Sequence, residues 1–239
     1  MSMKVDFDII NLKKGERKQF YFSEKEAGIV FLSGSCSVSF ETGEVFQSVG
    51  DRNTVFEKPG YAVYIPKDTR ADFEAITDEI SLAVISTDAK NKRKPFVVNP
   101  DNISGQVRGK KEWKRTVYDL FNDSTDSLYI GETYHTDGVW SGYPPHKHDT
   151  DIEGYESKNE EIYFVKVKPD NGFGVFINYT KKEEKKSRIV SDNDILYVKE
   201  GYHAIVSAPG FDFYYLWALS SKDRKFICSQ DDDYNWIEE

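Results

Sequence analysis

Short runs of apolar residues, separated by turn-forming residues, recur along almost the whole chain. In residues 28–40, two apolar runs flank a Ser-Gly-Ser sequence, a pattern that predicts two strands joined by a turn. Similar runs follow at residues 61–65, 80–86, 128–134, 162–167, 173–179, 195–198, 204–206 and 213–219. Helical periodicity is weak, and its best candidate is a short turn near residues 113–120. Strands at this spacing predict an all-β sandwich or barrel.

A polar, basic segment at residues 87–115 divides the strand pattern and is typical of a surface connector. A weak internal repeat supports two halves, because residues 64–75 (YIPKDTRADFEA) align with residues 197–208 (YVKEGYHAIVSA) on their tyrosines. A repeat length of about 130 residues indicates a duplicated β-domain, since solenoid repeats are roughly 20–50 residues long. We therefore expect an N-terminal domain at 1–100 and a C-terminal domain at 101–239.

Composition and charge narrow the class of protein. The chain of 239 residues has 41 acidic and 32 basic side chains, a net charge of −9, which argues against nucleic-acid binding. Its two cysteines, Cys36 and Cys228, exclude a disulfide scaffold and a cysteine-rich zinc site. The sequence has neither the apolar run of a signal peptide nor the ~20 apolar residues of a membrane helix. We expect a cytoplasmic protein that acts on a small molecule.

Candidate metal chemistry is concentrated in the C-terminal half, because no histidine precedes residue 135. His146 and His148 are two positions apart, so on an extended strand their rings share one face, as two ligands of one metal must. A third ligand could come from Glu160 or Glu161, and a fourth from His203 in the sequence GYHA. Three imidazoles and a carboxylate suit zinc, or a first-row transition metal such as iron or manganese.

The alternative for the HxH motif alone is a packed or solvated pair of rings, because such short motifs often match by chance. The context favours a metal, since three of the four histidines fall in this pattern. In the N-terminal half, Gly28 and Arg70 occupy the corresponding places of the repeat, and neither is a good ligand. We therefore expect a metal in the C-terminal half only.

Several segments together are similar to the 5-deoxy-glucuronate isomerase family of myo-inositol catabolism. They are YPPHKHDTD (143–151), ESKNEEIYF (156–164), GFGV (172–175), GYHA (201–204) and QDDDYNWI (230–237). The resemblance covers most of the chain, and the metal motif also resembles that of the 5-keto-4-deoxyuronate isomerases. It implies a bicupin, that is, two double-stranded β-helix (jelly-roll) barrels. The implied ligands of a divalent metal, with zinc favoured over iron or manganese, are His146, His148, Glu161 and His203.

The resemblance implies an aldose–ketose isomerisation of 5-deoxy-D-glucuronate to 5-dehydro-2-deoxy-D-gluconate. A metal would bind the carbonyl and the adjacent hydroxyl oxygen, and a base would move a proton between neighbouring carbons. Glu161 and Tyr163 are the catalytic candidates, because Tyr163 shares the face of Glu161. A structural tyrosine and a hydride shift without a base are the alternatives. Arg115 and Arg224 lie where family-like arginines occur and are candidates for binding the substrate carboxylate.

One departure from the family pattern concerns the substrate. Phe176 and Ile177 stand where the family often has Gln-Arg, which removes a cation that could have held the carboxylate, so another sugar acid is an alternative substrate. A cupin dioxygenase with the same ligands and a metal-free sugar-acid-binding cupin are the rival functions. The expected partner is a small-molecule sugar acid, without nucleic acid or membrane. A homo-oligomer stays open, because edge strands of cupins often pair between chains.

Overall fold

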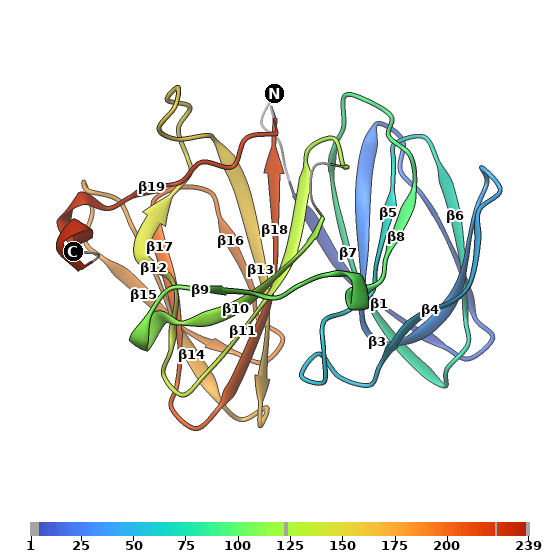
Figure 1. The fold of residues 1–239 in the computed structure, drawn as a ribbon, viewed down its shortest axis with the longest axis horizontal. Helices are drawn as coiled ribbons and strands as arrows, with labels where there is room; N and C mark the ends of the chain where they lie inside the picture. The colour runs from blue at the N-terminus through green and yellow to red at the C-terminus, as the bar shows by residue number, and fades with distance from the viewer. Residues whose placement is uncertain (1–4, 122–123, 223, 238–239) are drawn as a thin grey trace. The chain divides into compact units, whose positions relative to one another are not determined.

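Strands form almost all of the secondary structure in a computed structural model that describes residues 5–121, 124–222 and 224–237. Along these residues, the regular elements are strands β1 to β19 and three short 3-10 turns (Figure 1). The turns are η1 (Pro100–Asn102), η2 (Lys111–Trp113) and η3 (Asp232–Ile237). The prediction of an all-β protein is confirmed.

The chain forms two compact units. One contains the chain up to Ser104 together with Asp119–Ile130, and the other contains Gly105–Tyr118 and the chain from Gly131 onwards. The chain first passes from one unit to the other after Ser104. The return of Asp119–Ile130 to the N-terminal unit was not expected from the sequence.

A single eight-stranded sheet wraps around the core of the N-terminal unit. Its strands are β1 (Asp6–Lys13), β2 (Arg17–Tyr21), β3 (Lys25–Phe40), β4 (Val45–Arg52), β5 (Ala62–Ile65), β6 (Arg70–Ala75), β7 (Glu79–Asp88) and β8 (Phe96–Val98). Five of these strands follow the order β1-β7-β3-β5-β8. In addition, β4 and β6 pair with β3, and β2 pairs with β6. Fully buried side chains, among them Phe31, Val38 and Phe73, pack together as the hydrophobic core.

Strand β3 corrects one prediction, because residues 28–40 are not two strands joined by a turn. The strand runs without a break, pairing with β5 and β7 in its first half and with β4 and β6 in its second half. The change of partners coincides with register shifts on both sides of Gly34, whose φ is +77°. A Cβ at Gly34 would lie 2.5 Å from the Glu79 carbonyl oxygen. Glycine therefore allows a bulge that bends the strand where a turn was predicted.

A buried carboxylate fixes the segment that returns to the N-terminal unit. Glu26, on β3, is fully buried and accepts hydrogen bonds from the backbone N–H groups of Asp126 (2.8 Å), Ser127 and Leu128 (2.7 Å). The Tyr64 hydroxyl donates a fourth hydrogen bond to it. A carboxylate can be buried without a cation only if its oxygens are hydrogen-bonded in this way. Glu26 thus explains why residues 126–128 pack with β3.

Glu26→Gln should destabilise the protein, because an amide NH2 group would replace an oxygen that faces hydrogen-bond donors. We expect a loss of roughly 1–3 kcal/mol in the free energy of unfolding, measured by urea denaturation. Glu41→Gln, at an exposed position, is the matched control and should change little. Equal stabilities of the two variants would contradict the anchoring role of Glu26.

The strands after η1 form two further sheets. They are β9 (Gln106–Arg108), β10 (Arg115–Phe121), β11 (Leu128–Thr136), β12 (Trp140–Lys147), β13 (Asn159–Lys168), β14 (Phe173–Tyr179), β15 (Lys186–Ser191), β16 (Ile195–Val198), β17 (Tyr202–Ser207), β18 (Asp212–Ser221) and β19 (Ser229–Gln230). The six-stranded sheet has the order β16-β13-β18-β11-β10-β9, and the five-stranded sheet has the order β15-β14-β17-β12-β19. The helical candidate near residues 113–120 is mostly strand β10.

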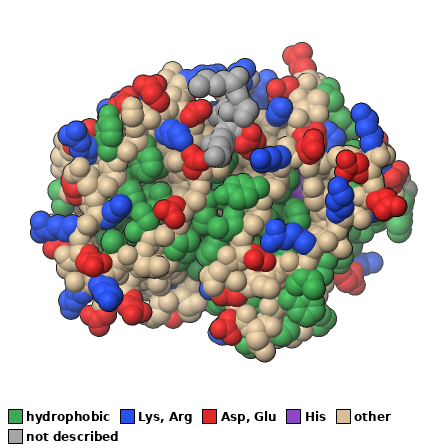
Figure 2. Space-filling view, turned by 180° about the vertical axis from the view of Figure 1, so that it is seen from behind, with side chains coloured by type: hydrophobic (Ala, Val, Ile, Leu, Met, Phe, Trp, Pro, Cys, Tyr) green, Lys and Arg blue, Asp and Glu red, His purple; other side chains and the backbone are tan. Residues whose placement is uncertain are grey.

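On the face shown in Figure 2, acidic and basic side chains are interspersed rather than gathered into one basic area. Among the described residues, no helix combines the length and apolar character needed to cross a membrane.

Candidate metal centre

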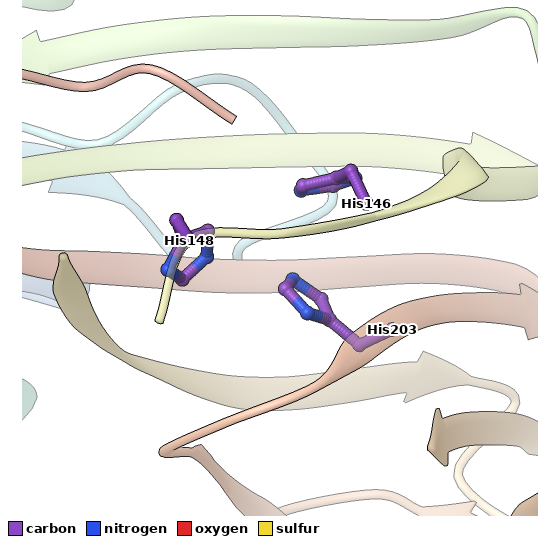
Figure 3. A group of neighbouring side chains, drawn as sticks. All are labelled: His146, His148 and His203. Atoms are coloured by element: carbon purple, nitrogen blue, oxygen red, sulfur yellow. The ribbon is translucent and has the colours of Figure 1, made fainter. Parts of the chain in front are cut away.

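Three histidines converge inside the C-terminal unit (Figure 3). His146 lies on β12, His148 follows directly after this strand, and His203 lies on β17. One ring nitrogen from each lies within 4.8 Å of the others. All three side chains are largely withdrawn from water, with His203 fully buried. The three rings are therefore close enough to share one ion.

An irregularity in β12 brings His146 to the third histidine. Ser141 pairs with Ile205 and His146 pairs with His203, so five steps along β12 match only two along β17. The four residues between them, Gly-Tyr-Pro-Pro, lie opposite Ala204 alone, and prolines cannot donate hydrogen bonds to a neighbouring strand. The YPP sequence thus forms a bulge that sets His146 directly opposite His203.

The backbone fixes the tautomer of each histidine. In every case Nδ1 lies at hydrogen-bond distance from a carbonyl oxygen. The acceptors are Gly142 for His146 (3.2 Å), Asn159 for His148 (3.0 Å) and Gly201 for His203 (3.2 Å). A carbonyl oxygen only accepts, so Nδ1 carries a proton, and Nε2 is the nitrogen left to bind a metal once it holds no proton of its own.

Glu161 supplies a carboxylate from the opposite sheet. It lies on β13, and its Oε2 is 3.0 Å from Nε2 of His148 and 3.2 Å from Nε2 of His203. Burial alone would raise the pKa of Glu161, but the hydrogen bond from Nε2 of His148 and the proximity of His203 outweigh it and lower the pKa to about 2. The carboxylate is therefore ionised. Glu160, the other candidate, pairs in register with Ser220, one position away on the alternate face of the strand.

The ring nitrogens show that this set of residues fits a metal. Nε2 of His203 is buried and makes no hydrogen bond of adequate geometry, although the Glu161 carboxylate is 3.2 Å away. Burial, and then the neighbouring histidines, lower the pKa of His146 to about 3, so this ring is neutral, as a ligand must be. Three imidazoles with a carboxylate match the donors that zinc, iron and manganese accept.

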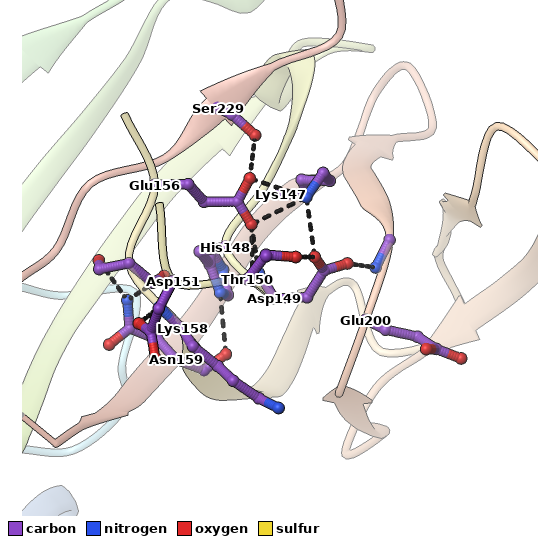
Figure 4. A network of polar contacts seen from close by, with 12 residues as sticks. Lys147, His148, Asp149, Thr150, Asp151, Glu156, Lys158, Asn159, Glu200 and Ser229 are labelled. Carbon is purple, nitrogen blue, oxygen red and sulfur yellow. Dashed lines mark hydrogen bonds and ion pairs between the residues drawn. The ribbon is translucent and has the colours of Figure 1, made fainter. Parts of the chain in front are cut away.

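A network of charges holds the ligand-bearing segments in place (Figure 4). Lys147, between two of the histidines, donates to Asp149 (2.8 Å) and to the buried Glu156 (2.7 Å). Glu156 also accepts the backbone N–H groups of Asp149 and Thr150, each at 2.8 Å. The other Asp149 oxygen accepts the N–H of Gly201, at 2.6 Å. The network therefore ties the end of β12 to the turn before His203.

Tyr163 also reaches the carboxylate, as its position two residues after Glu161 predicts. Its hydroxyl donates to Oε2 of Glu161 at 3.1 Å. Burial, and then the charge of Glu161, raise the pKa of Tyr163 well above its ordinary value. The phenol therefore keeps its proton at neutral pH, which favours proton donation over the role of a base.

A cavity of about 70 Å³ opens beside these residues. Its lining includes His146, Glu161 and Tyr163, together with Arg108 and Arg115. Sequence reasoning singled out Arg115 but not Arg108, which lies in the polar segment interpreted as a surface connector. Arg224, the other arginine it singled out, lies in the loop after β18 and is not part of this lining. A role for either predicted arginine in binding substrate stays a prediction.

The fourth histidine, His135, is a buried group that sequence reasoning left without a role. It lies on β11, with its ring 4.9 Å from the ring of Phe213 and 5.9 Å from that of Tyr215. Neither ring nitrogen makes a hydrogen bond of adequate geometry. Burial lowers the pKa of His135 to about 3, and the charge of Arg115 acts in the same direction. His135 is therefore a neutral ring in the interior, and only its burial in the structure identifies it.

A cupin barrel with an interior histidine–carboxylate centre is the class that this geometry defines, and the chain as a whole is a bicupin. Its fold is similar to two solved oxalate decarboxylases. A point mutant of the Bacillus subtilis enzyme gives a TM-score of 0.65 at 12% identity, covering 96% of this chain and 71% of that one. The Lactobacillus farciminis enzyme gives 0.71 at 9% identity, covering 98% and 81%. At these identities the likeness shows the fold alone.

The chain belongs to the KduI/IolB family, whose model matches residues 1–237. It is 33% identical to a protein from Geobacillus kaustophilus named 5-deoxy-glucuronate isomerase, over 98% of this chain and 86% of that protein. It is also 33% identical to a solved IolB-like protein from Salmonella typhimurium LT2, with a TM-score of 0.92 over 98% and 90% of the chains. The family resemblance predicted from YPPHKHD and its companion segments is confirmed.

His148→Ala should weaken metal binding at least ~100-fold, because it removes one ligand from the centre. Metal content after dialysis, measured by mass spectrometry, is the readout, and circular dichroism checks the fold. His135→Phe is the matched control, since it removes a buried histidine outside the ligand set. Full metal occupancy in His148→Ala would contradict the assignment of the centre.

His135 should make the protein sensitive to acid. The unfolded chain takes up a proton on His135 near pH 6.5, whereas the folded chain does so only near pH 3. The stability associated with the neutral ring is therefore complete above pH 6.5 and is lost as the pH falls towards 3. In that window His135→Phe should lose less stability than the wild type, by up to ~1.4 kcal/mol per pH unit.

Urea denaturation between pH 7.5 and 4 measures this difference. The value at pH 7.5, above the titration, gives the effect of the substitution on packing alone. Parallel stability curves for His135→Phe and the wild type would contradict the interpretation of His135 as a buried neutral ring.

Proposed function

We propose that this protein is a metal-dependent isomerase that converts 5-deoxy-D-glucuronate to 5-dehydro-2-deoxy-D-gluconate in myo-inositol catabolism. One observation carries the proposal. One ring nitrogen from each of three histidines lies within 4.8 Å of the others, and Glu161, which is close to two of them, lines a cavity together with His146 and two arginines. Relatives named 5-deoxy-glucuronate isomerase, such as those from Geobacillus kaustophilus and Geobacillus thermodenitrificans, support the choice of substrate.

His146, His148, Glu161 and His203 would hold the metal, which we propose to be zinc, with iron or manganese as alternatives. When bound there, a divalent ion supplies a Lewis acid for the carbonyl oxygen and the adjacent hydroxyl oxygen of a sugar. The charge network around Lys147 keeps two of these ligands in place. The two sheets keep the centre withdrawn from water, where a fixed charge acts more strongly.

Proton movement between the two substrate oxygens is the role that we propose for Tyr163. An aldose becomes a ketose when one proton moves from C2 to C1 and another from O2 to O1. The protonated phenol would donate to O1 and recover a proton from O2, so that it ends as it began. Glu161, which accepts the hydrogen bond of Tyr163 at 3.1 Å, would hold that hydroxyl in position and so act in catalysis as well as in ligation.

Two routes exist for the hydrogen on carbon, and the solvent distinguishes them. If a base removes the proton from C2, product formed in D2O carries deuterium at C1. If the hydrogen moves directly as hydride, the product carries none. Either result leaves the proposed role of Tyr163 between the oxygens intact.

A neighbouring side chain favours a second candidate, namely isomerisation of a different sugar acid. Phe176 is buried, with its ring 6.2 Å from that of Tyr163 and 6.4 Å from that of His203. An apolar ring therefore stands close to the centre where the family often has a polar residue. A closely related sugar acid is the next substrate to test if 5-deoxy-glucuronate is unchanged. We also propose that the protein acts in the cytoplasm.

The proposal is tested by incubating the zinc-loaded protein with 5-deoxy-glucuronate and following the mixture by NMR. We expect signals of the ketose to appear, at least ~100-fold more slowly with Tyr163→Phe, because general acid–base catalysis typically contributes 10²–10⁴-fold. Thr136→Val, at an exposed position on β11, is a control that should keep full activity. Oxygen uptake with a carbonyl substrate would identify a dioxygenase instead. Binding of the sugar acid without turnover would identify a binding protein.

A further inference from the structure

We propose that Arg108 and Arg115 together form the subsite for the carboxylate of the substrate, opposite the end at which the histidines meet the sugar. The identity of the substrate rests on the proposed function, whereas the anion subsite itself rests on the geometry of two strands. The inference assigns a role to Arg108 and orients the sugar acid, with its carbonyl end towards His146 and its carboxylate towards β9 and β10.

The pairing of β9 with β10 places the two arginines side by side. Arg108 and Arg115 are direct partners in the antiparallel register, so their side chains leave the same face of the sheet. Both line the cavity that also contains His146 and Glu161. Two guanidinium groups among the lining residues favour an anionic ligand in this cavity, because a carboxylate can accept from both.

The hydrogen bonds of Arg115 point to the same ligand. Its Nε is buried without a hydrogen-bond partner, and its Nη1 donates to the carbonyl oxygen of Trp113 at a long 3.3 Å. A buried guanidinium N–H normally has an acceptor, and a carboxylate is the acceptor whose two oxygens match the fork of an arginine. A substrate carboxylate would satisfy this nitrogen.

A residue of the same strand, β9, holds the side chain of Arg108. Its Nε and Nη2 donate to Oε1 of Gln106, at 3.3 and 3.0 Å. Because Gln106 is two residues away, it lies on the same side of β9 and keeps the guanidinium at the cavity. The pair of arginines comes from the six-stranded sheet, so the cation missing at Ile177 on the five-stranded sheet is not needed to bind a carboxylate.

Arg108→Met and Arg108→Lys test the subsite by two independent measurements. The first is KM and kcat for 5-deoxy-glucuronate. The second is calorimetric binding of D-glucuronate, a six-carbon sugar acid, compared with D-glucose, which has CH2OH in place of the carboxylate. Arg188→Met, on β15 and exposed, is the matched control. Thermal unfolding verifies that each variant is folded.

We expect Arg108→Met to raise KM and the Kd for glucuronate about 10- to 100-fold, as loss of a charge-assisted hydrogen bond predicts. Glucose binding should not change, and Arg108→Lys should retain part of the preference for the acid. If glucuronate binding depends on Arg108 while 5-deoxy-glucuronate is not converted, the subsite stands and the proposed function fails. If Arg108→Met binds glucuronate like Arg188→Met, or loses kcat alone, the subsite is wrong.

Discussion

The ionised carboxylate of Glu161, buried among histidines, is the constraint on which the interior of the C-terminal unit depends. A buried negative charge is costly unless positive or hydrogen-donating groups surround it. Here the neighbours are His148, His203 and the Tyr163 hydroxyl. Backbone carbonyls already accept the Nδ1 proton of each of the three histidines, so a cation bound through Nε2 would balance the charge of Glu161 in place of a second proton on a ring. The same carboxylate accepts the hydrogen bond of the Tyr163 hydroxyl and so fixes the position of that group.

The N-terminal unit also buries a carboxyl group, but it stabilises this group in another way. Glu26 is also a fully buried carboxylate, yet its hydrogen bonds come from three backbone N–H groups and the Tyr64 hydroxyl. Arg70, which the internal repeat aligns with His203, is exposed in that unit. Gly28, which it aligns with Glu161, has no room for a side chain, since a Cβ would lie 2.3 Å from Ile130. Glu26, on β3, therefore anchors the returning segment of the chain, whereas Glu161, on β13, lies at the centre of the histidine cluster.

The sequence predicted those features of the fold and the site that depend on residues close together in the chain. Short apolar runs separated by turn-forming residues predicted the β class, and the family resemblance led to Glu161 rather than Glu160. The convergence of His146 with His203 was also predicted, but the bulge at YPP that aligns them was not. Arg108 was missed because it becomes significant only through its pairing with Arg115, a partner seven residues away that no periodicity indicates. The continuity of β3 through Gly34 was missed because Ser-Gly-Ser also fits a turn, and only its sheet partners decide between the two.

X-ray absorption at the metal edge of the purified, metal-loaded protein measures most directly whether one ion binds the three Nε2 atoms and Glu161. We expect N and O neighbours at about 2.0–2.2 Å and the outer-shell scattering of three imidazole rings. Fewer than two imidazoles, or a sulfur neighbour at about 2.3 Å, would contradict this expectation.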